Sequence, residues 1–285
     1  MRVYISADLE GVAGLVSRDT QMGPDGSDYQ TSRVLMTEEV NAVIRGVLAG
    51  GATRVVVNDS HGRMGNIIPD RLHPAAQLSQ GYPKLLYMMD GVDGGFDLVF
   101  FVGYHARIGT ADGILNHSYN SRGIYGVRVN GKVLGEPGLN ARLAGYFGVP
   151  VAFVAGDEAT VGETLAELPD IEGVVTKYGL NRYAARSLSP AQSRENLEAG
   201  AKRALERATG RAGAAAGKPW KPALLMEDGP VKWEVELLYS AMVDLCTLVP
   251  GVRRTGGRSV EWTSADYLEG FKAFLAMTIL VGTIA

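Results

Sequence analysis

Several features that would assign a protein to a common class are scarce in this sequence. It holds a single cysteine, Cys246, among 285 residues, which excludes an internal disulfide and any zinc cluster built on thiolates. Its most apolar segment, residues 275–285, is shorter than the roughly 20 residues that a membrane-spanning helix needs. There is no run of Lys and Arg, and the formal net charge is −3. We therefore expect no membrane partner and no nucleic-acid partner.

The first residues of the chain do not have the pattern of a secretory signal peptide. The first residues, MRVYISADLEG, lack the basic start and long apolar core of a secretory signal. With 46% hydrophobic and 21% charged residues, the composition is that of an ordinary globular protein. A lone cysteine suits a reducing compartment. These features predict a cytoplasmic globular protein of one large domain or two modest ones.

Short apolar runs alternate with helical patterns over the first 210 residues. A continuous apolar run is typical of a parallel strand covered on both faces. Helical spacing of apolar residues over 36–48, and Ser189 followed by Pro190, predict helices between such strands. The expected strands lie at residues 3–5, 55–57, 98–102, 151–154 and 174–175. The pattern predicts an α/β fold with a mostly parallel sheet flanked by helices.

Within the first 210 residues, Asn130-Gly131 between alternating arms also predicts a β-hairpin. The last quarter of the chain has a different character. Residues 209–222 are small, polar and proline-bearing, which is typical of a linker. Beyond them we expect a strand near Trp233, a helix at about 240–249, two short strands and a last helix from Asp266. The sequence thus predicts two domains, a catalytic metal-binding α/β domain at 1–210 and a small α+β domain (β-α-β-β-α) at 220–285.

Acidic and imidazole side chains follow the ends of the predicted strands. In open parallel sheets, ligands bind beyond the carboxyl ends of the strands. Two of the four histidines stand at such positions. The residues concerned are Asp8, Glu10, His61, His105 and, after the hairpin, Glu136.

Charge and ligand chemistry favour a two-metal site at these positions. Carboxylates and imidazoles suit Zn, Mn, Co or Fe. Two divalent ions would be neutralised by Asp8, Glu10, Glu136 and a bridging hydroxide, which avoids an unpaired buried charge. A two-metal site needs a bridging carboxylate, and the short side chain of Asp8 at a strand end is the one we expect to bridge.

Simpler interpretations exist for individual residues. Asp8 and Glu10 could cap a helix, and for Asp59 capping is the favoured interpretation. His73 is expected at the surface, and Cys246 in the core. His117 lies in a polar stretch, so the residues alone favour a solvated loop position for it. The combination of two histidines with several acids past strand ends is what favours a metal site.

Six short motifs in one order resemble the D-aminopeptidase family of the DppA type, which consists of binuclear zinc metallopeptidases. They are residues 6–11 (SADLEG), 58–62 (NDSHG), 103–106 (GYHA), 116–118 (NHS), 135–136 (GE) and 156–157 (GD). The resemblance runs from residue 1 to about 180, and the C-terminal β-α-β-β-α pattern also fits the family. Pro137 departs from the family pattern, since an apolar or aromatic residue is expected there, and it could alter the wall of the site.

The resemblance implies roles for particular residues. Two Zn²⁺ per chain would be held by Asp8, Glu10, His61, His105 and Glu136, and His117 would lie near the metals as a catalytic residue. Such an enzyme is an aminopeptidase acting on short peptides with an N-terminal D-amino acid. The family also implies a homo-oligomer, a decamer of two stacked pentamers.

Alternatives remain open from the sequence. The same metal core could serve an L-specific peptidase or another amidase. A metal-dependent peptide-binding protein without turnover is the alternative outside enzymes. For the oligomer, the apolar C-terminal tail with Trp220 and Trp233 could form an interface or could simply be core.

Overall fold

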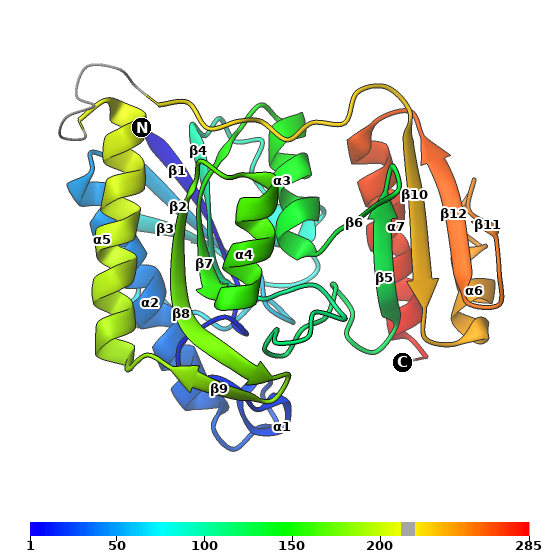
Figure 1. Ribbon diagram of the computed structural model, residues 1–285, viewed down its shortest axis with the longest axis horizontal. Coiled ribbons are helices and arrows are strands. Elements are labelled where there is room, and N and C mark those ends of the chain that lie inside the picture. The colour runs from blue at the N-terminus through cyan, green and yellow to red at the C-terminus, as the bar shows by residue number, and fades with distance from the viewer. Residues whose placement is uncertain (212–219, 285) are drawn as a thin grey trace.

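The computed structural model describes residues 1–211 and 220–284, and residues 212–219 of the expected linker lie outside them. Two β-sheets, each with its own helices, stand side by side (Figure 1). This architecture confirms the expected α/β fold with a mostly parallel sheet and a smaller C-terminal α+β part. Every helix of the described residues is too short or too polar to cross a membrane.

The larger sheet contains seven strands in the order β3-β2-β1-β4-β7-β8-β9. All neighbours pair in parallel except β9, which runs antiparallel to β8. All five expected apolar runs lie in strands of this sheet. The strands are β1 (Arg2–Ala7), β2 (Arg54–Asp59), β3 (Ala76–Ser79), β4 (Leu98–Tyr104), β7 (Val151–Asp157), β8 (Glu172–Asn181) and β9 (Ala184–Ser187).

Helices cover both faces of this sheet, which explains why its central strands β1, β4 and β7 are buried along most of their length. On one face α2 (Tyr29–Ala49) packs along α5 (Pro190–Thr209), and on the other lie α3 (Glu136–Tyr146) and α4 (Glu158–Glu167) (Figure 1). The helix α5 begins as expected, because the Ser189 hydroxyl accepts a hydrogen bond from the Gln192 amide at 3.2 Å. The short elements α1 (Arg18–Gln21), η1 (Pro69–Arg71) and η2 (Tyr87–Met89) lie in the connections.

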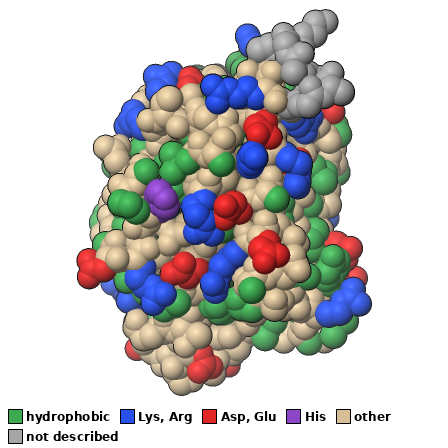
Figure 2. Space-filling view, turned by 90° about the vertical axis from the view of Figure 1, so that its left-hand side faces the viewer, with side chains coloured by type: hydrophobic (Ala, Val, Ile, Leu, Met, Phe, Trp, Pro, Cys, Tyr) green, Lys and Arg blue, Asp and Glu red, His purple; other side chains and the backbone are tan. Residues whose placement is uncertain are grey.

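The outer surface of the α2/α5 layer is solvated. Figure 2 shows basic and acidic side chains intermingled on this face. Pairs such as Arg45 with Glu198 at 2.7 Å join the two helices. Because the two signs alternate, this face offers no continuous positive patch to a polyanion.

The smaller sheet is antiparallel, in the order β11-β12-β10-β5-β6. Its C-terminal strands are β10 (Val231–Leu237), β11 (Arg253–Arg254) and β12 (Ser259–Ser264), with α6 (Ser240–Cys246) and α7 (Tyr267–Gly282). This is the expected β-α-β-β-α order, with α6 ending before the expected 249. The helix α7 lies between this sheet and α3 (Figure 1).

The Asn-Gly hairpin joins the two parts of the chain. Its strands are β5 (Ile124–Val129) and β6 (Lys132–Val133), and the turn residues Asn130 and Gly131 have φ of 49° and 79°, as a tight hairpin turn requires. Strand β5 pairs with β10, so a segment from the first 210 residues completes the second sheet. A division at 210–220 into two domains stays a prediction, and it does not follow the sheet boundary.

The two tryptophans considered for an interface have different positions. Trp233 is fully buried, its ring stacked on Trp262 with centroids 5.5 Å apart, so it belongs to the core. Trp220 is half-buried. Cys246 is fully buried and belongs to the core, as expected.

Candidate active site

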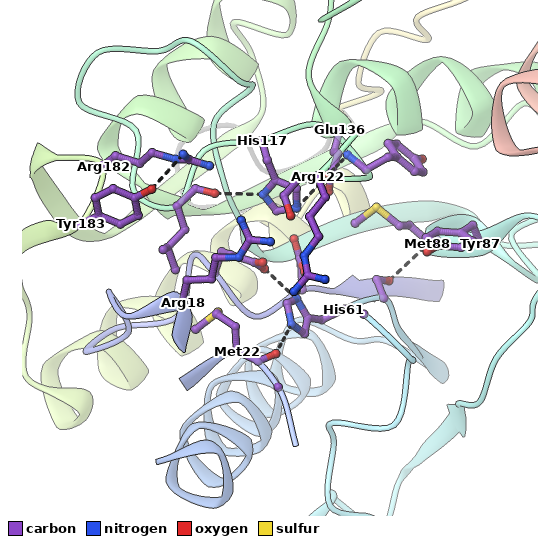
Figure 3. Close-up of a pocket in the computed structure, with 18 residues that line it drawn as sticks. Arg18, Met22, His61, Tyr87, Met88, His117, Arg122, Glu136, Arg182 and Tyr183 are labelled. Carbon is purple, nitrogen blue, oxygen red and sulfur yellow. Dashed lines mark hydrogen bonds and ion pairs between the residues drawn. The ribbon is translucent and has the colours of Figure 1, made fainter. Parts of the chain in front are cut away.

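The carboxyl ends of β1, β2 and β4 meet at one edge of the large sheet. Strand β1 lies between β2 and β4, and the chain winds outward in opposite directions from the β1/β4 pair, which is the topological switch point where α/β sheets bind ligands. Asp8 follows β1, His61 follows β2 and His105 follows β4. Glu136 is the first residue of α3. A cavity of about 290 Å³ opens here, lined by Asp8, Glu10, His61, His117 and Glu136 among others (Figure 3).

Two glycines let the β1 and β4 ends approach closely enough to share this edge. A Cβ at Gly11 would stand 2.0 Å from the Tyr104 carbonyl oxygen. Gly103 has φ of 71°, and a Cβ there would stand 2.1 Å from the Asp8 carbonyl oxygen. Any side chain at either position would push Asp8 away from His105. The glycine flanks seen in the sequence therefore have a steric reason.

Asp8 lies at the centre of the cluster, between two groups of candidate ligands. Its Oδ1 is 3.3 Å from His61 Nδ1, and that nitrogen is 2.8 Å from Glu10 Oε2. Its Oδ2 is 3.6 Å from His105 Nε2, which is 3.3 Å from Glu136 Oε2. Asp8 with Glu10 and His61, and Asp8 with His105 and Glu136, each have ligand atoms close enough to hold one ion. This is the arrangement expected if Asp8 bridges two ions.

Each histidine of the cluster is oriented by a backbone carbonyl. His61 Nε2 lies 2.8 Å from the Met22 oxygen, and His105 Nδ1 lies 2.9 Å from the Ala106 oxygen. A carbonyl can only accept, so these nitrogens carry the proton and donate. When the ring is neutral, the other nitrogen presents a lone pair toward the carboxylates. Metal-binding histidines are commonly fixed in this way.

His117 joins the cluster instead of lying in a solvated loop. Its ring stacks on that of His105, with centroids 4.0 Å apart. Its Nδ1 donates to the Leu115 oxygen at 3.0 Å, so Nε2 faces Glu136 Oε1 at 3.8 Å. Leu115 and Tyr119, on either side, have φ of 51° and 57°, a strained conformation for such residues. One nitrogen of the His117 ring is also close enough to Glu10 and His105 ligand atoms to share an ion with them, so the geometry alone allows ligation as well as catalysis.

Burial and mutual charge shift the protonation of the whole cluster. Burial, together with the neighbouring Glu10 carboxylate, raises the pKa of Asp8 to about 7. Burial also works against charge on His105, but Glu136 outweighs it and holds the pKa of His105 well above its usual value. Burial and the adjacent His105 lower the pKa of His117 to about 4. In this cluster, bound protons offset the negative charge of the carboxylates. A bound cation would replace those protons and offset the same charge.

Two buried atoms identify where a cation fits. Asp8 Oδ2 and His105 Nε2 are buried and, among the described residues, have no hydrogen-bond partner. An orphaned acceptor beside an orphaned imidazole nitrogen is costly unless an ion or solvent satisfies both. The donor set of three carboxylates and imidazoles, without thiolates, is one that Zn²⁺ accepts. The residues present therefore fit a divalent metal.

A buried polar network lies behind the cluster. The Tyr104 hydroxyl bonds the Ser6 hydroxyl at 2.7 Å and receives a bond from Asn140 Nδ2 at 3.0 Å. Asn140 Oδ1 in turn accepts from the Tyr119 hydroxyl at 2.5 Å. The network connects the ends of β1 and β4 to α3, which carry Asp8, His105 and Glu136. Such shared bonds restrict how far those elements can move apart.

Other polar residues past the strand ends have structural roles. Asp59 accepts from the backbone amides of Asn66 and Ile67 at 2.5 and 2.7 Å, so it stabilises the loop after β2. The expected helix cap is wrong for this residue, because the next helical element, η1, begins at Pro69 and follows Ile68 as its N-cap. Half-buried His73 lies outside the cluster and accepts from the Ala75 amide. Pro137, expected to alter the site wall, instead lines a separate cavity of about 220 Å³, and its ring suits the first turn of α3.

Sequence reasoning missed the basic residues of the cavity. Arg18, Arg122 and Arg182 line it, with Tyr183 and Met22. They come from three separate connections and share no spacing with the acidic motifs. Lys177 was missed too, although it is buried on β8 and supports the Glu10 loop. The one available signal was a lysine two residues after the apolar run Val174-Val175.

A switch-point cavity with buried carboxylates and imidazoles fits the class of metal-dependent hydrolases. A family model described as D-aminopeptidase matches residues 1–276. A D-aminopeptidase of Bacillus subtilis (strain 168) is 37% identical over 284 residues, which cover 98% of this chain and 97% of that protein. The solved structure of the "Zn-dependent D-aminopeptidase DppA from Bacillus subtilis, a self-compartmentalizing protease" has a TM-score of 0.91 and 34% identity, covering 99% of this chain and 98% of the other. The chain belongs to the D-aminopeptidase family of peptidases.

Proposed function

We propose that this chain is a zinc-dependent aminopeptidase that releases the N-terminal residue, of D configuration, from short peptides. The observation that carries the proposal is the position of Asp8 between two groups of ligand atoms in one buried cluster. Both similar proteins are described as D-aminopeptidases, and one of them as Zn-dependent. The fold and the family both support hydrolysis.

The residues would share the work of holding two metals. Asp8, Glu10 and His61 would hold one ion, and Asp8, His105 and Glu136 the other. Bound zinc supplies Lewis acidity toward the scissile carbonyl and lowers the pKa of water. The backbone carbonyls of Met22 and Ala106 keep His61 and His105 in the tautomers that present a lone pair to the cluster.

His117 is suited to proton transfer in the reaction. When water adds to the peptide carbonyl and the C–N bond breaks, the departing amine takes up a proton. His117 lines the cavity, and its Nδ1 proton is held by the Leu115 carbonyl. Its Nε2 therefore faces the reacting groups and can carry the proton. Glu136 Oε1, which lies 3.8 Å from that nitrogen, is itself held by the Tyr119 amide at 2.6 Å.

The assembly we propose is a homo-oligomeric ring, a decamer, in the cytoplasm. The similar solved structure is described as self-compartmentalizing, a property that an assembly can provide. Large apolar side chains are exposed on the single chain, including Leu85, Leu180 and Leu248, and they could supply contacts between copies. Light scattering at micromolar concentration is expected to give ten chains, and a monomeric mass would reject the ring.

One assay separates the candidate activities. D-alanyl and L-alanyl chromogenic amides are each incubated with the protein, with chelator, and with chelator followed by Zn²⁺. We expect hydrolysis of the D-isomer, loss with chelator and recovery with zinc. Faster L-isomer cleavage would point to an L-specific peptidase, and zinc-dependent peptide binding without cleavage to a binding protein.

Metal analysis complements the assay. Fully loaded active protein is expected to contain two zinc ions per chain, and one or fewer would reject the two-metal site. His61→Ala and His105→Ala should each remove activity and reduce the zinc content with little loss of fold. His73→Ala is the matched control, because His73 lies outside the cluster.

A further inference from the structure

Three arginines surround the entrance to the metal-ligand cluster. Arg18 begins α1, Arg122 lies just before β5, and Arg182 lies in the turn between β8 and β9. All three line the cavity that contains Asp8, Glu10 and Glu136. Figure 3 shows the side chains of Arg18 and Arg122 pointing toward the middle of the cavity, whereas Arg182 lies beside Tyr183. Cationic side chains from three connections thus converge on one small space.

These arginines lack the carboxylate partners that other arginines in the fold have. Arg142, for example, pairs with Glu167 at 2.8 Å and Glu227 at 2.7 Å. Within residues 1–211 and 220–284, the guanidinium groups of Arg18 and Arg122 have no hydrogen bond or ion pair with the protein. The guanidinium of Arg182 bonds the Tyr183 hydroxyl at 3.0 Å, and its Nε is buried without a partner.

The charge of the cavity then favours an anionic ligand. Its acids, Asp8, Glu10 and Glu136, face the metal position and, with a hydroxide, would be balanced by two divalent ions. The guanidinium groups then leave a net positive charge toward the entrance. In a small cavity partly shielded from water, such a field attracts and orients an anion. Arginine is the side chain best matched to a carboxylate, because its planar group can bind both oxygens.

A short peptide has such an anion at a suitable place. Its ammonium end must reach the acidic cluster for the first peptide bond to be cleaved. Each residue extends the chain by at most roughly 3.3–3.6 Å, so the terminal carboxylate of a di- or tripeptide lies within roughly 7 Å of the scissile bond. The cavity, about 290 Å³, is slightly smaller than the roughly 300–1,000 Å³ typical of ligand pockets. Both ends of such a peptide can lie inside it.

We propose that Arg18 and Arg122 bind the C-terminal carboxylate of the substrate, with Arg182 contributing to the positive field, so that the site selects peptides of two or three residues with a free C-terminus. This inference rests on the aminopeptidase function proposed above and names its substrate class. The two arginines are specificity-determining residues, since they contact the end of the substrate that does not react. A peptide amide or a longer peptide loses this contact and is cleaved less efficiently.

The kinetic test compares acid and amide forms of one substrate. With the zinc-loaded enzyme, kcat/KM is measured for a D-alanyl-D-alanine dipeptide and for its C-terminal amide. The ratio of the two values is the readout. We expect wild type to favour the free acid at least about tenfold, and Arg18→Met and Arg122→Met each to lower that ratio roughly tenfold or more, as for a charge-assisted hydrogen bond. The loss should lie mainly in KM.

Arg54→Met is the matched control. Arg54 is exposed at the start of β2, at the opposite end of the strand from His61, and its guanidinium lies 5.1 Å from the Phe96 ring centre. This variant should keep the wild-type ratio. A wild type that cleaves acid and amide equally, or arginine variants with an unchanged ratio, would overturn the carboxylate contact.

Binding without turnover provides an independent readout. A dipeptide analogue with a reduced, uncleavable CH₂–NH bond is titrated by calorimetry as the free acid and as the amide. Wild type should bind the acid roughly ten- to a hundredfold more tightly, and Arg122→Met should lose most of that difference. Equal binding of both forms overturns the proposal. If neither dipeptide form is cleaved by wild type although the acid binds through the arginines, the proposed activity fails and the carboxylate site stands.

Discussion

The ammonium group of Lys177 lies against the backbone carbonyl of Glu10, beneath the loop that leads away from β1. The same ammonium donates to the carbonyls of Val12 at 2.9 Å and Leu15 at 2.5 Å. Burial lowers the pKa of Lys177 to about 8, so at pH 7 the group is still charged. One fully buried side chain thus ties three carbonyls of a single loop and holds Glu10 toward the cluster.

Lys177→Met tests whether this contact positions the site. The substitution keeps the length of the side chain but leaves three buried acceptors without their donor, which should reduce the free energy of unfolding by about 2–4 kcal/mol. Because Glu10 would no longer be fixed, zinc affinity should also fall about tenfold or more. Chemical denaturation and competitive zinc titration measure the two effects.

Lys202→Met is the control for that substitution. Lys202 is exposed on α5 and is 3.7 Å from Glu206, so its loss should change stability by no more than about 0.5 kcal/mol. A Lys177 variant that loses stability but keeps full zinc affinity would assign Lys177 to the fold alone and contradict the positioning role.

Tyr104→Phe examines the network behind Asp8 and His105. The change removes a hydroxyl that bonds Ser6 and Asn140 and leaves both of those buried groups short of a partner. We expect a loss of about 1–3 kcal/mol in the free energy of unfolding, with a smaller loss of zinc affinity. Tyr146→Phe is the control, since its hydroxyl bonds Asp266 on the surface. Equal effects of the two substitutions would show that the buried network adds nothing.

We predict that the difference in Tm between Glu39→Gln and wild type depends on pH. Burial raises the pKa of Glu39, against the hydrogen bonds from Ser193 and the Ala13 amide. The folded protein therefore keeps this proton at pH values where the unfolded chain has lost it. Its stabilising contribution is complete below the usual carboxyl pKa and is lost as pH rises through the folded value. Glutamine stays neutral, so the variant should gain in Tm relative to wild type as pH rises from about 4 to 7.

Glu195→Gln is the control for the Glu39 substitution. Glu195→Gln alters an exposed carboxyl on α5, and its Tm difference from wild type should stay nearly constant over the same pH range. If the Glu39 difference is equally constant, or moves in wild type's favour with rising pH, the sign derived from burial is wrong.

The fold and the clustering of the acids could be predicted because both follow from local patterns. A strand covered on both faces must be apolar throughout, as Val3, Tyr4 and Ile5 are, and their side chains are all fully buried. Parallel strands align their carboxyl ends, so Asp8, which follows β1, could be expected near His105, which follows β4, without knowledge of the loops.

The remaining features depend on contacts between distant segments. The alternation around Trp233 indicates a half-exposed strand, but it does not indicate which element covers the apolar face. In the structure α7 covers it, and the Phe274 ring stacks on that of Trp233 with centroids 6.1 Å apart. Arg18 and Arg122 are about a hundred residues apart in connections without periodicity, and only the folded chain puts them in one cavity. The same holds for the contact between Lys177 and Glu10.

His117→Ala addresses the residue for which sequence and family resemblance disagreed. The histidine stacks on His105, and its Nε2 faces Glu136, yet Asp8, His61 and the other candidate ligands form two complete groups without it. We therefore expect the variant to retain two zinc ions and its oligomeric state. Loss of a general acid should lower kcat roughly 10²–10⁴-fold, with a smaller change in KM.

Three measurements on that variant distinguish the possible roles. Zinc content decides whether His117 is a ligand, because its ring is also close enough to Glu10 and His105 ligand atoms to share an ion with them. If the variant loses an ion, His117 binds metal and the set of five ligands is incomplete. If it keeps both ions and near-wild-type kcat, the ring is a packing partner of His105 and another group delivers the proton. Partial rescue of kcat by added imidazole, with zinc content unchanged, is the result expected of a proton donor, because free imidazole can occupy the vacated space and carry the same proton.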